Sequence, residues 1–155
     1  MTADAETVVR AAYHAAEGDV LDVRGFIDLF TEDGVFNNVV AGESYRGEHL
    51  GDQVAFMGAL APDIHRELHR VHVMGDVVAV ELTIEGTVTG PFETPAGTVW
   101  ATGARLGIPT ADFWYVQNGK VKEFNCYVGL SVMLAQLGVH PDFASAVTAS
   151  PATAP

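Results

Sequence analysis

The sequence has little of what covalent or metal-based stabilisation requires. Cys126 is the only cysteine among 155 residues, so neither an internal disulfide nor a zinc site built from cysteines can form. Apolar runs are short, and none approaches the roughly 20 residues that span a bilayer. The amino terminus also lacks the basic and then apolar pattern of a signal peptide. We therefore expect a cytoplasmic protein without a membrane partner.

Basic residues are also scarce. Eight Lys and Arg residues stand against 20 Asp and Glu residues, which gives a formal net charge of -12. Phosphate groups bind to clustered Lys and Arg, so this balance argues against nucleic acid or an anionic lipid surface as partner. The length and the 48% of hydrophobic residues suit one core. We expect a single domain over residues 1–147 and a disordered Pro-, Ala-, Ser- and Thr-rich tail over 148–155.

The pattern of apolar residues changes from helical to strand-like along the chain, which predicts an α+β fold. In the first half, apolar residues recur at spacings of three and four. In the second half, β-branched and aromatic residues fill segments separated by glycine-containing turns, which is typical of an antiparallel sheet. The predicted helices are 6–17, 23–30, 50–60 and 130–137, and the predicted strands are 35–40, 69–74, 77–89, 111–116 and 121–128.

A two-residue turn at 75–76 would set the register of one hairpin. Counting back from this turn places His69 opposite Leu82, on the same face as Val71 and Val73. This face would be apolar with one imidazole on it.

A type I′ turn at 118–119, an Asn-Gly pair, would set the register of the last hairpin. Counting back from it places Asp112 opposite Asn125, so that a carboxylate and a carboxamide meet across two strands. The other face would also be apolar and would need cover, for which a second copy of the chain is the simplest candidate. The residues predicted on that face are Phe113, Tyr115, Phe124 and Cys126.

The order of these elements and several short motifs resemble the SnoaL-like polyketide cyclases, a family of the nuclear transport factor two-like superfamily. This superfamily also contains ketosteroid isomerases and limonene epoxide hydrolases. The resemblance covers roughly residues 5–140. The segments that carry it are Glu32–Asn38, Tyr45–Gly47, Gly86–Gly90, Asp112–Val116, Asn118–Val121 and Leu134–Gly138.

The resemblance implies a cone-shaped α+β barrel, in which a curved antiparallel sheet covered by three N-terminal helices encloses a pocket. It also implies a homodimer and catalysis without metal or cofactor. Asp112 occupies the position of the base in the cyclases, and Asn38 matches a polar position at the end of the first strand.

The residue types around Asp112 are consistent with a base in an apolar pocket. A strand that continues with Phe113 and Trp114 is a poor place for a carboxylate unless it has a polar partner or a function. Desolvation would raise its pKa towards neutrality and make it a better base towards a carbon next to a carbonyl. Asn38, Asn125 or His69 could then polarise the carbonyl oxygen, and the sequence leaves open which of them does so.

The ligand is expected to be a small apolar or ring-containing organic molecule. Tyr13 on the first predicted helix could direct its hydroxyl into the pocket. Three histidines at positions 65, 69 and 72 raise the question of a metal, but in a strand they do not line up as ligands, so none is expected. The expected substrate-binding residues are Tyr13, Phe36, Phe56, Met57 and Trp114.

Two departures from the relatives bear on the reaction. The cyclase motif reads Gly-Thr-His-Thr-Gly, and here Val88 replaces the histidine. The positions of the Tyr and the Asp-Arg-Asp relay of the epoxide hydrolases hold Phe36, Leu82, Ile84 and Cys126. The leading hypothesis is a cyclase, isomerase or lyase that uses cofactor-free acid-base catalysis. The alternative is a non-catalytic ligand-binding or interaction protein of the same fold.

Overall fold

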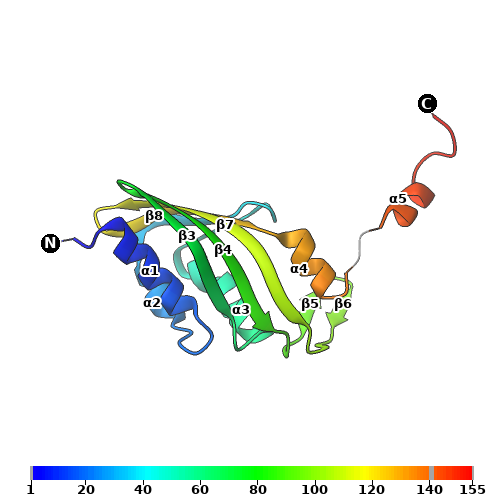
Figure 1. Ribbon diagram of the computed structural model, residues 1–155, viewed down its shortest axis with the longest axis horizontal. Coiled ribbons are helices and arrows are strands. Elements are labelled where there is room, and N and C mark those ends of the chain that lie inside the picture. Colours follow the sequence, from blue (N-terminus) through cyan, green and yellow to red (C-terminus); the bar gives the residue numbers. More distant parts are fainter. Residues whose placement is uncertain (1, 140–141, 155) are drawn as a thin grey trace.

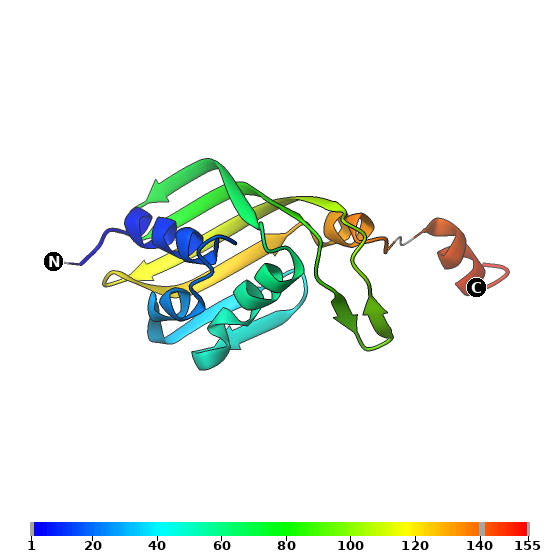
Figure 2. The same cartoon turned by 90° about the horizontal axis from the view of Figure 1, so that it is seen from below.

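The computed structural model describes residues 2–139 and 142–154 and shows an α+β fold (Figure 1). A curved six-stranded sheet carries three helices on one face, α1 (Ala5–Ala16), α2 (Val23–Asp28) and α3 (Asp52–Leu60). Seen from below, the three helices lie across this face (Figure 2). The predicted fold class and the three N-terminal helices are therefore confirmed.

The sheet is open rather than closed into a barrel, and β2 and β3 form its two edges. Its order is β2-β1-β8-β7-β4-β3. The four strands predicted in the second half pair antiparallel as expected, and the β1–β8 pair is parallel. The parallel pair arises because the first strand enters the sheet beside the last one. The strands are β1 (Phe30–Asn38), β2 (Glu43–Arg46), β3 (His65–Met74), β4 (Val77–Thr87), β7 (Arg105–Gln117) and β8 (Lys120–Val128).

Several short elements had no clear signal in the sequence. The third helix is preceded by a 3-10 turn, and a small separate hairpin follows β4. These segments are too short for a periodic pattern to reveal them. They are β2, the 3-10 helix η1 (Gly47–Gly51), the hairpin strands β5 (Phe92–Thr94) and β6 (Gly97–Val99), and the helix α5 (Phe143–Ala149); the predicted helix near residue 130 is α4 (Leu130–Gln136).

Helix α1 shows how the sequence fixes one of the layers. Asp4 caps its first turn by accepting a hydrogen bond from the backbone N–H of Thr7 at 2.8 Å. Val9 and Ala12 lie on the buried face of the helix and are at most 1% exposed. This apolar face packs onto the sheet and places Tyr13 above its centre.

A bulge in the last hairpin changes which side chains of β8 face the helices. The turn itself is as expected, since Asn118 and Gly119 have φ of 51° and 75°. The register then shifts between Val116 and Tyr115, so that Asp112 pairs with Cys126 and not with the predicted Asn125. Because the side-chain period of a strand is two, this one-residue offset moves the rest of β8 to the opposite face.

A second bulge, in β3, has the same kind of effect. The predicted pairs of Val73 and Val71 with β4 are present, but the register shifts between Leu68 and Arg70 and leaves His69 without a partner residue. Leu68 therefore pairs with Leu82, and the predicted pairing of His69 with Leu82 is wrong. The bulge turns Arg66 and Leu68 to the face that packs against the helices, which the simple hairpin count had assigned to His69.

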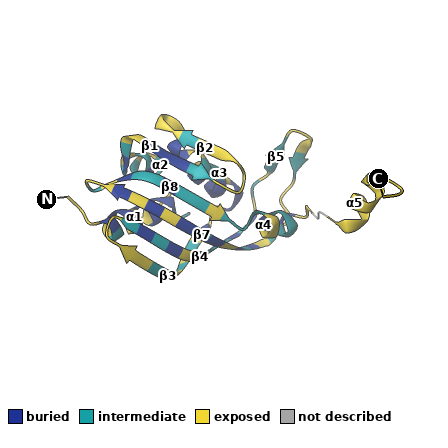
Figure 3. Cartoon of the chain, turned by 90° about the horizontal axis from the view of Figure 1, so that it is seen from above, coloured by how far each residue is buried: buried dark blue, intermediate teal, exposed yellow. Residues whose placement is uncertain are grey.

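Exposed and buried positions alternate along β7 (Figure 3), and three exposed aromatic residues of β7 and β8 belong to the face away from the helices. Phe113, Tyr115 and Tyr127 are 37%, 38% and 43% exposed. Phe124 and Cys126, which were also predicted on this face, lie on the helix side because of the bulge in the last hairpin.

Beyond α4, the chain extends away from the sheet. Helix α5 has no buried residue and includes Thr148, so the predicted boundary at residue 147 falls inside a helix. Residue 155 of the predicted tail lies outside the described residues, and disorder of the tail stays a prediction. None of the described helices has the length and apolar composition needed to cross a membrane.

Candidate functional site

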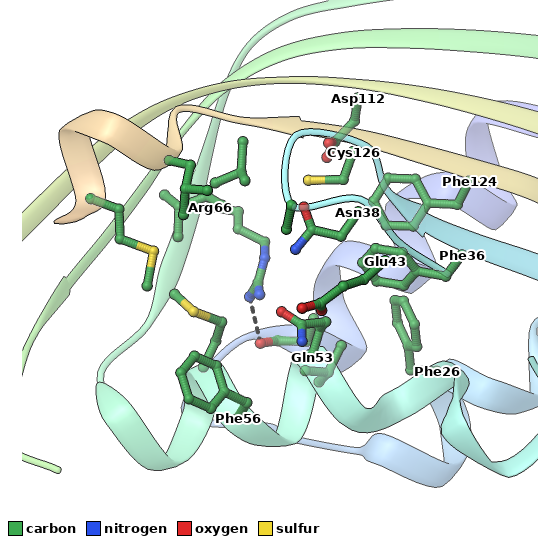
Figure 4. Close-up of a pocket in the computed structure, with 18 of the residues that line it drawn as sticks. Phe26, Phe36, Asn38, Glu43, Gln53, Phe56, Arg66, Asp112, Phe124 and Cys126 are labelled. Carbon is green, nitrogen blue, oxygen red and sulfur yellow. Dashed lines mark hydrogen bonds between the residues drawn. The ribbon is translucent and has the colours of Figure 1, made fainter. Parts of the chain in front are cut away.

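A cavity of about 320 Å³ lies between the helices and the concave face of the sheet. This volume is at the lower end of the range for small-molecule sites. Most of its wall is apolar, and a few polar side chains reach into it (Figure 4). All five side chains predicted to contact a substrate line this cavity, and so do Asp112 and Asn38. The five are Tyr13, Phe36, Phe56, Met57 and Trp114.

Asp112 lies deep in this cavity and is bound to a residue of the opposite layer. It is 3% exposed, and its Oδ2 accepts a hydrogen bond of 2.7 Å from the hydroxyl of Tyr13. The Tyr13 oxygen in turn accepts a 3.0 Å bond from Nε1 of Trp114. Trp114 follows Asp112 by two residues on β7, so both side chains point to the same face of the strand. The sequence placed Tyr13 in the pocket but gave no sign of this chain of hydrogen bonds.

The other carboxylate oxygen of Asp112 lies beside the Cys126 thiol of the neighbouring strand. Oδ1 is buried and has no hydrogen-bond partner among the described residues. A buried acceptor without a partner is costly, because it has lost water and gained nothing in return. One oxygen of Asp112 is therefore fixed by Tyr13, and the other has no strong hydrogen bond within the described residues of the cavity wall.

Burial dominates the ionisation of this group. It raises the pKa of Asp112 to about 6, against the opposing effects of the Tyr13 hydrogen bond, the Cys126 thiol and the Arg66 charge. Burial and then the nearby Asp112 charge raise the pKa of Tyr13 well above its ordinary value. The same two causes raise the pKa of the Cys126 thiol. Tyr13 and Cys126 are therefore neutral at physiological pH, while Asp112 can change its charge there.

Asn38 offers a second polar group without a partner. It ends β1 and pairs in register with Cys126 of β8, which itself pairs with Asp112. The three side chains therefore lie in a row across neighbouring strands (Figure 4). The side-chain oxygen Oδ1 of Asn38 is buried and has no partner among the described residues.

Arg66 is the one basic residue among those that line the cavity, and sequence reasoning missed it. Its side chain enters the cavity from β3, and Nη1 donates a 2.7 Å hydrogen bond to the backbone oxygen of Ala16 at the end of α1 (Figure 4). Only the β3 bulge brings it there, and no local sequence signal marked that bulge.

A cluster of polar side chains lies at another part of the cavity wall. Gln53 from α3 donates a 2.8 Å bond to the hydroxyl of Tyr45, which donates to the carboxylate of Glu43. Glu43 and Gln53 both line the cavity, and Glu43 is exposed to solvent. This cluster is thus on the solvent side of the cavity and was also not predicted.

The structure does not bring His69 and Asn125 to the cavity. His69 is exposed, and its Nε2 lies 2.7 Å from the Thr83 hydroxyl. Asn125 points to the outer face, where its Oδ1 accepts a 2.8 Å bond from Asn37. Both displacements follow from the two bulges, which reverse the facing of these residues relative to a regular hairpin.

Histidines and carboxylates do not gather into a metal-binding group in the described part of the chain. His65 lies 3.0 Å from Glu17 and 2.9 Å from Glu67 at an exposed position. The neighbouring carboxylates, Glu67 first, raise its pKa.

Comparisons with known proteins agree with this fold. Residues 9–124 match the family described as the SnoaL-like domain, and the chain belongs to this family. The predicted resemblance is therefore confirmed. A search of curated protein sequences found no match.

Solved structures with the same fold include enzyme candidates from streptomycetes. One is AclR, a candidate hydroxylase from Streptomyces galilaeus, with 20% identity over 93% of each chain and a TM-score of 0.74. Another is IdmH, a candidate polyketide cyclase from Streptomyces antibioticus, with 24% identity over 86% of this chain and 98% of that chain and a TM-score of 0.68. A ketosteroid isomerase-like protein from Catenulispora acidiphila in complex with trimethylamine has 22% identity over 86% and 93% and a TM-score of 0.69. At these identities, the likeness establishes the fold alone.

Proposed function

We propose that the protein is a small-molecule enzyme of the cyclase, isomerase or lyase type, in which Asp112 removes a proton from a carbon next to a carbonyl group. The observation that carries this proposal is the state of Asp112 itself. One oxygen is held by Tyr13, the other is buried without a partner and faces the cavity, and burial brings its pKa to about 6. A base with a pKa near the working pH is the most effective for proton transfer.

The proton moves from the substrate carbon to Oδ1 of Asp112, and the electron pair left behind shifts onto the carbonyl oxygen as an enolate. The side chain of Asn38 lines the cavity, and its carboxamide N–H can donate a hydrogen bond to the enolate oxygen of the substrate. Tyr13 keeps the carboxyl group in place during the transfer. The apolar wall around Asp112 lowers the local polarity, which strengthens these interactions.

The enolate can then react in three ways that need no cofactor. It can take the proton back from Asp112 at another carbon, which is an isomerisation. It can attack a second carbonyl in the same molecule, which closes a ring, and Asp112 then protonates the new alkoxide. It can also expel a group from the neighbouring carbon, which is the lyase reaction. The apolar wall of Phe36, Phe56 and Trp114 suits a ring-containing substrate in each case.

Hydrogen-deuterium exchange tests the shared first step without knowledge of the natural substrate. The protein is incubated in D₂O with 2-tetralone, a bicyclic ketone with an acidic carbon, and loss of the C–H signal is followed by NMR. We expect exchange to be faster than in buffer and to fall by about 10² to 10⁴ in Asp112→Asn, which keeps the shape of the side chain but cannot accept the proton. Tetralone that binds in the cavity but exchanges equally with both proteins would contradict the proposal.

The second candidate is a ligand-binding protein that has the cavity without the chemistry. This ligand-binding alternative is favoured by Val88, which stands where the cyclases carry a histidine. Val88 is buried and does not line the cavity, so nothing replaces that imidazole at this position. Binding of ring compounds without any exchange at acidic carbons would support this alternative.

We also propose that the protein forms a homodimer through the outer face of the sheet. Phe113, Tyr115 and Tyr127 form an exposed aromatic group there, and Phe113 and Tyr127 pack edge to face with centroids 5.9 Å apart. A second copy would remove this apolar surface from water.

A further inference from the structure

We infer that the natural substrate carries a carboxylate and that Arg66 binds it. This inference rests on the proposed function only in taking the cavity as the substrate site. It names the class of substrate and adds a specificity-determining residue to that site.

The guanidinium of Arg66 is partly desolvated and forms no ion pair with a carboxylate of the described residues. Arg66 is part-buried, and its Nη1 donates a hydrogen bond to the backbone oxygen of Ala16. Within residues 2–139 and 142–154, no carboxylate forms an ion pair with it at 4.0 Å or less. Glu17 comes near but uses its Oε1 for the backbone N–H of Arg66 and its Oε2 for His65. Burial lowers the pKa of Arg66, against the nearby charges of Glu17 and Asp112, because the guanidinium has lost part of its hydration.

The N–H groups of Arg66 that are not bonded to Ala16 face the cavity. A guanidinium has five N–H groups, and one of them is held by Ala16. The nitrogens of Arg66 are not among the buried atoms that lack a partner, so those without a protein acceptor are open to the cavity. Figure 4 shows the side chain reaching into the space between Asn38 and Phe56. Planar paired N–H donors match the two oxygens of a carboxylate.

The rest of the molecule carries an excess of negative charge. With a net charge of -12, the protein as a whole repels anions. Asp112 and Glu43 add negative charge to the cavity wall. A preference for an anion could therefore come only from a local cation, and Arg66 is the one basic side chain in the wall.

The arrangement assigns different ends of the substrate to different groups. Arg66 lies on β3, and Asp112 lies on β7, with β4 between them. A carboxylate held by Arg66 would orient the ring so that the acidic carbon meets Oδ1 of Asp112. The unpartnered oxygen of Asn38 would accept a hydrogen bond from a hydroxyl group of the same substrate.

The test compares two probes of nearly equal shape, 2-naphthoate and 2-naphthamide, by their dissociation constants at pH 7.5 and 0.15 M salt. We expect the wild type to bind naphthoate at least about tenfold more tightly than naphthamide, because a charge-assisted hydrogen bond contributes more than a neutral one. Arg66→Met should abolish this preference, and Arg66→Lys should retain part of it. Arg70→Met is the matched control, since it removes an exposed arginine from the same strand and changes the net charge equally.

Equal affinity of the wild type for both probes, or a preference that survives in Arg66→Met, would overturn the inference. If Arg66→Met does not fold, the Nε–Hε signal of Arg66 in the wild type decides, and it must shift with naphthoate and not with naphthamide. Asp112→Asn should keep or increase the preference for naphthoate, since it removes a negative charge. If 2-tetralone does not exchange, the role of Asp112 as a base fails but carboxylate binding by Arg66 is unaffected. If the preference for naphthoate is absent, carboxylate binding by Arg66 fails but the role of Asp112 is unaffected.

Discussion

The hydroxyl of Tyr13 lies 2.7 Å from Oδ2 of Asp112, although the two residues are 99 positions apart in the chain. This bond ties helix α1 to the centre of the sheet at the deepest polar point of the cavity. It also moderates the ionisation of the site, because it opposes the larger effect of burial on the pKa of Asp112. Several testable consequences depend on this pair.

Replacing Asp112 by Asn should stabilise the protein at neutral pH. The pKa of Asp112 is about 6 in the folded state and about 3.9 in an unfolded chain, so its folded-state contribution is most favourable below pH 4 and is lost as the pH rises through 6. At about 1.4 kcal/mol per pKa unit, ionisation of the buried group costs about 3 kcal/mol at pH 8. Urea unfolding should show Asp112→Asn to be the more stable protein at pH 8, with a gap that closes towards pH 4. A constant difference over this range would contradict the assigned pKa.

Replacing Tyr13 by Phe should weaken the fold and raise the pKa of Asp112. The variant leaves both Oδ2 of Asp112 and Nε1 of Trp114 without their partner, and each lost bond at a buried group costs about 1 to 3 kcal/mol. The free energy of unfolding and the Asp112 carboxyl titration measure the two effects. Tyr115→Phe on the outer face is the control and should change neither. An unchanged titration of Asp112 in Tyr13→Phe would show that the hydrogen bond is absent in solution.

Alanine variants of Asn38, His69 and Asn125 should differ in their affinity for a ligand, because only Asn38 lines the cavity. Asn38→Ala should lower the affinity for 2-tetralone by several-fold, because Asn38 lines the cavity and its amide would donate a hydrogen bond to the ketone oxygen in the proposed complex. His69→Ala and Asn125→Ala should leave this affinity within about twofold, since these side chains point away from it. An effect of His69→Ala as large as that of Asn38→Ala would mean that the β3 bulge is misplaced.

Charged substitutions on the outer face should test the proposed homodimer. Tyr127→Lys places a charge in the exposed aromatic group without touching the cavity. We expect the wild type to sediment as a dimer and this variant as a monomer, because a buried unpaired charge opposes association. A wild type that is monomeric at high concentration would exclude the proposed interface.

The sequence was sufficient for the layers of the fold and for several aromatic and polar residues of the cavity wall. Periodic apolar patterns and turn residues are local signals, and they located α1, α3 and the main hairpins. The motif resemblance then placed Asp112 and Asn38 in one pocket, as the structure does.

The errors in the site have one physical origin. A strand side chain changes face when one residue is inserted. Because of the bulges in β3 and in the β7–β8 pair, Arg66 faces the cavity in place of His69, and Cys126 faces it in place of Asn125. A bulge is decided by packing across the sheet, here by burial of Phe124 against Trp114 with ring centroids 3.6 Å apart. No pattern within either strand records that contact, so the register could not be obtained from the turns alone.

The most direct test of Asp112 as a desolvated base is its carboxyl titration in the free protein by ¹³C NMR, with Asp112→Asn to assign the signal. We expect a midpoint near pH 6, set by burial and moderated by Tyr13. A midpoint near 4, the ordinary value for an exposed aspartate, would show that the carboxylate is hydrated and would contradict its proposed role.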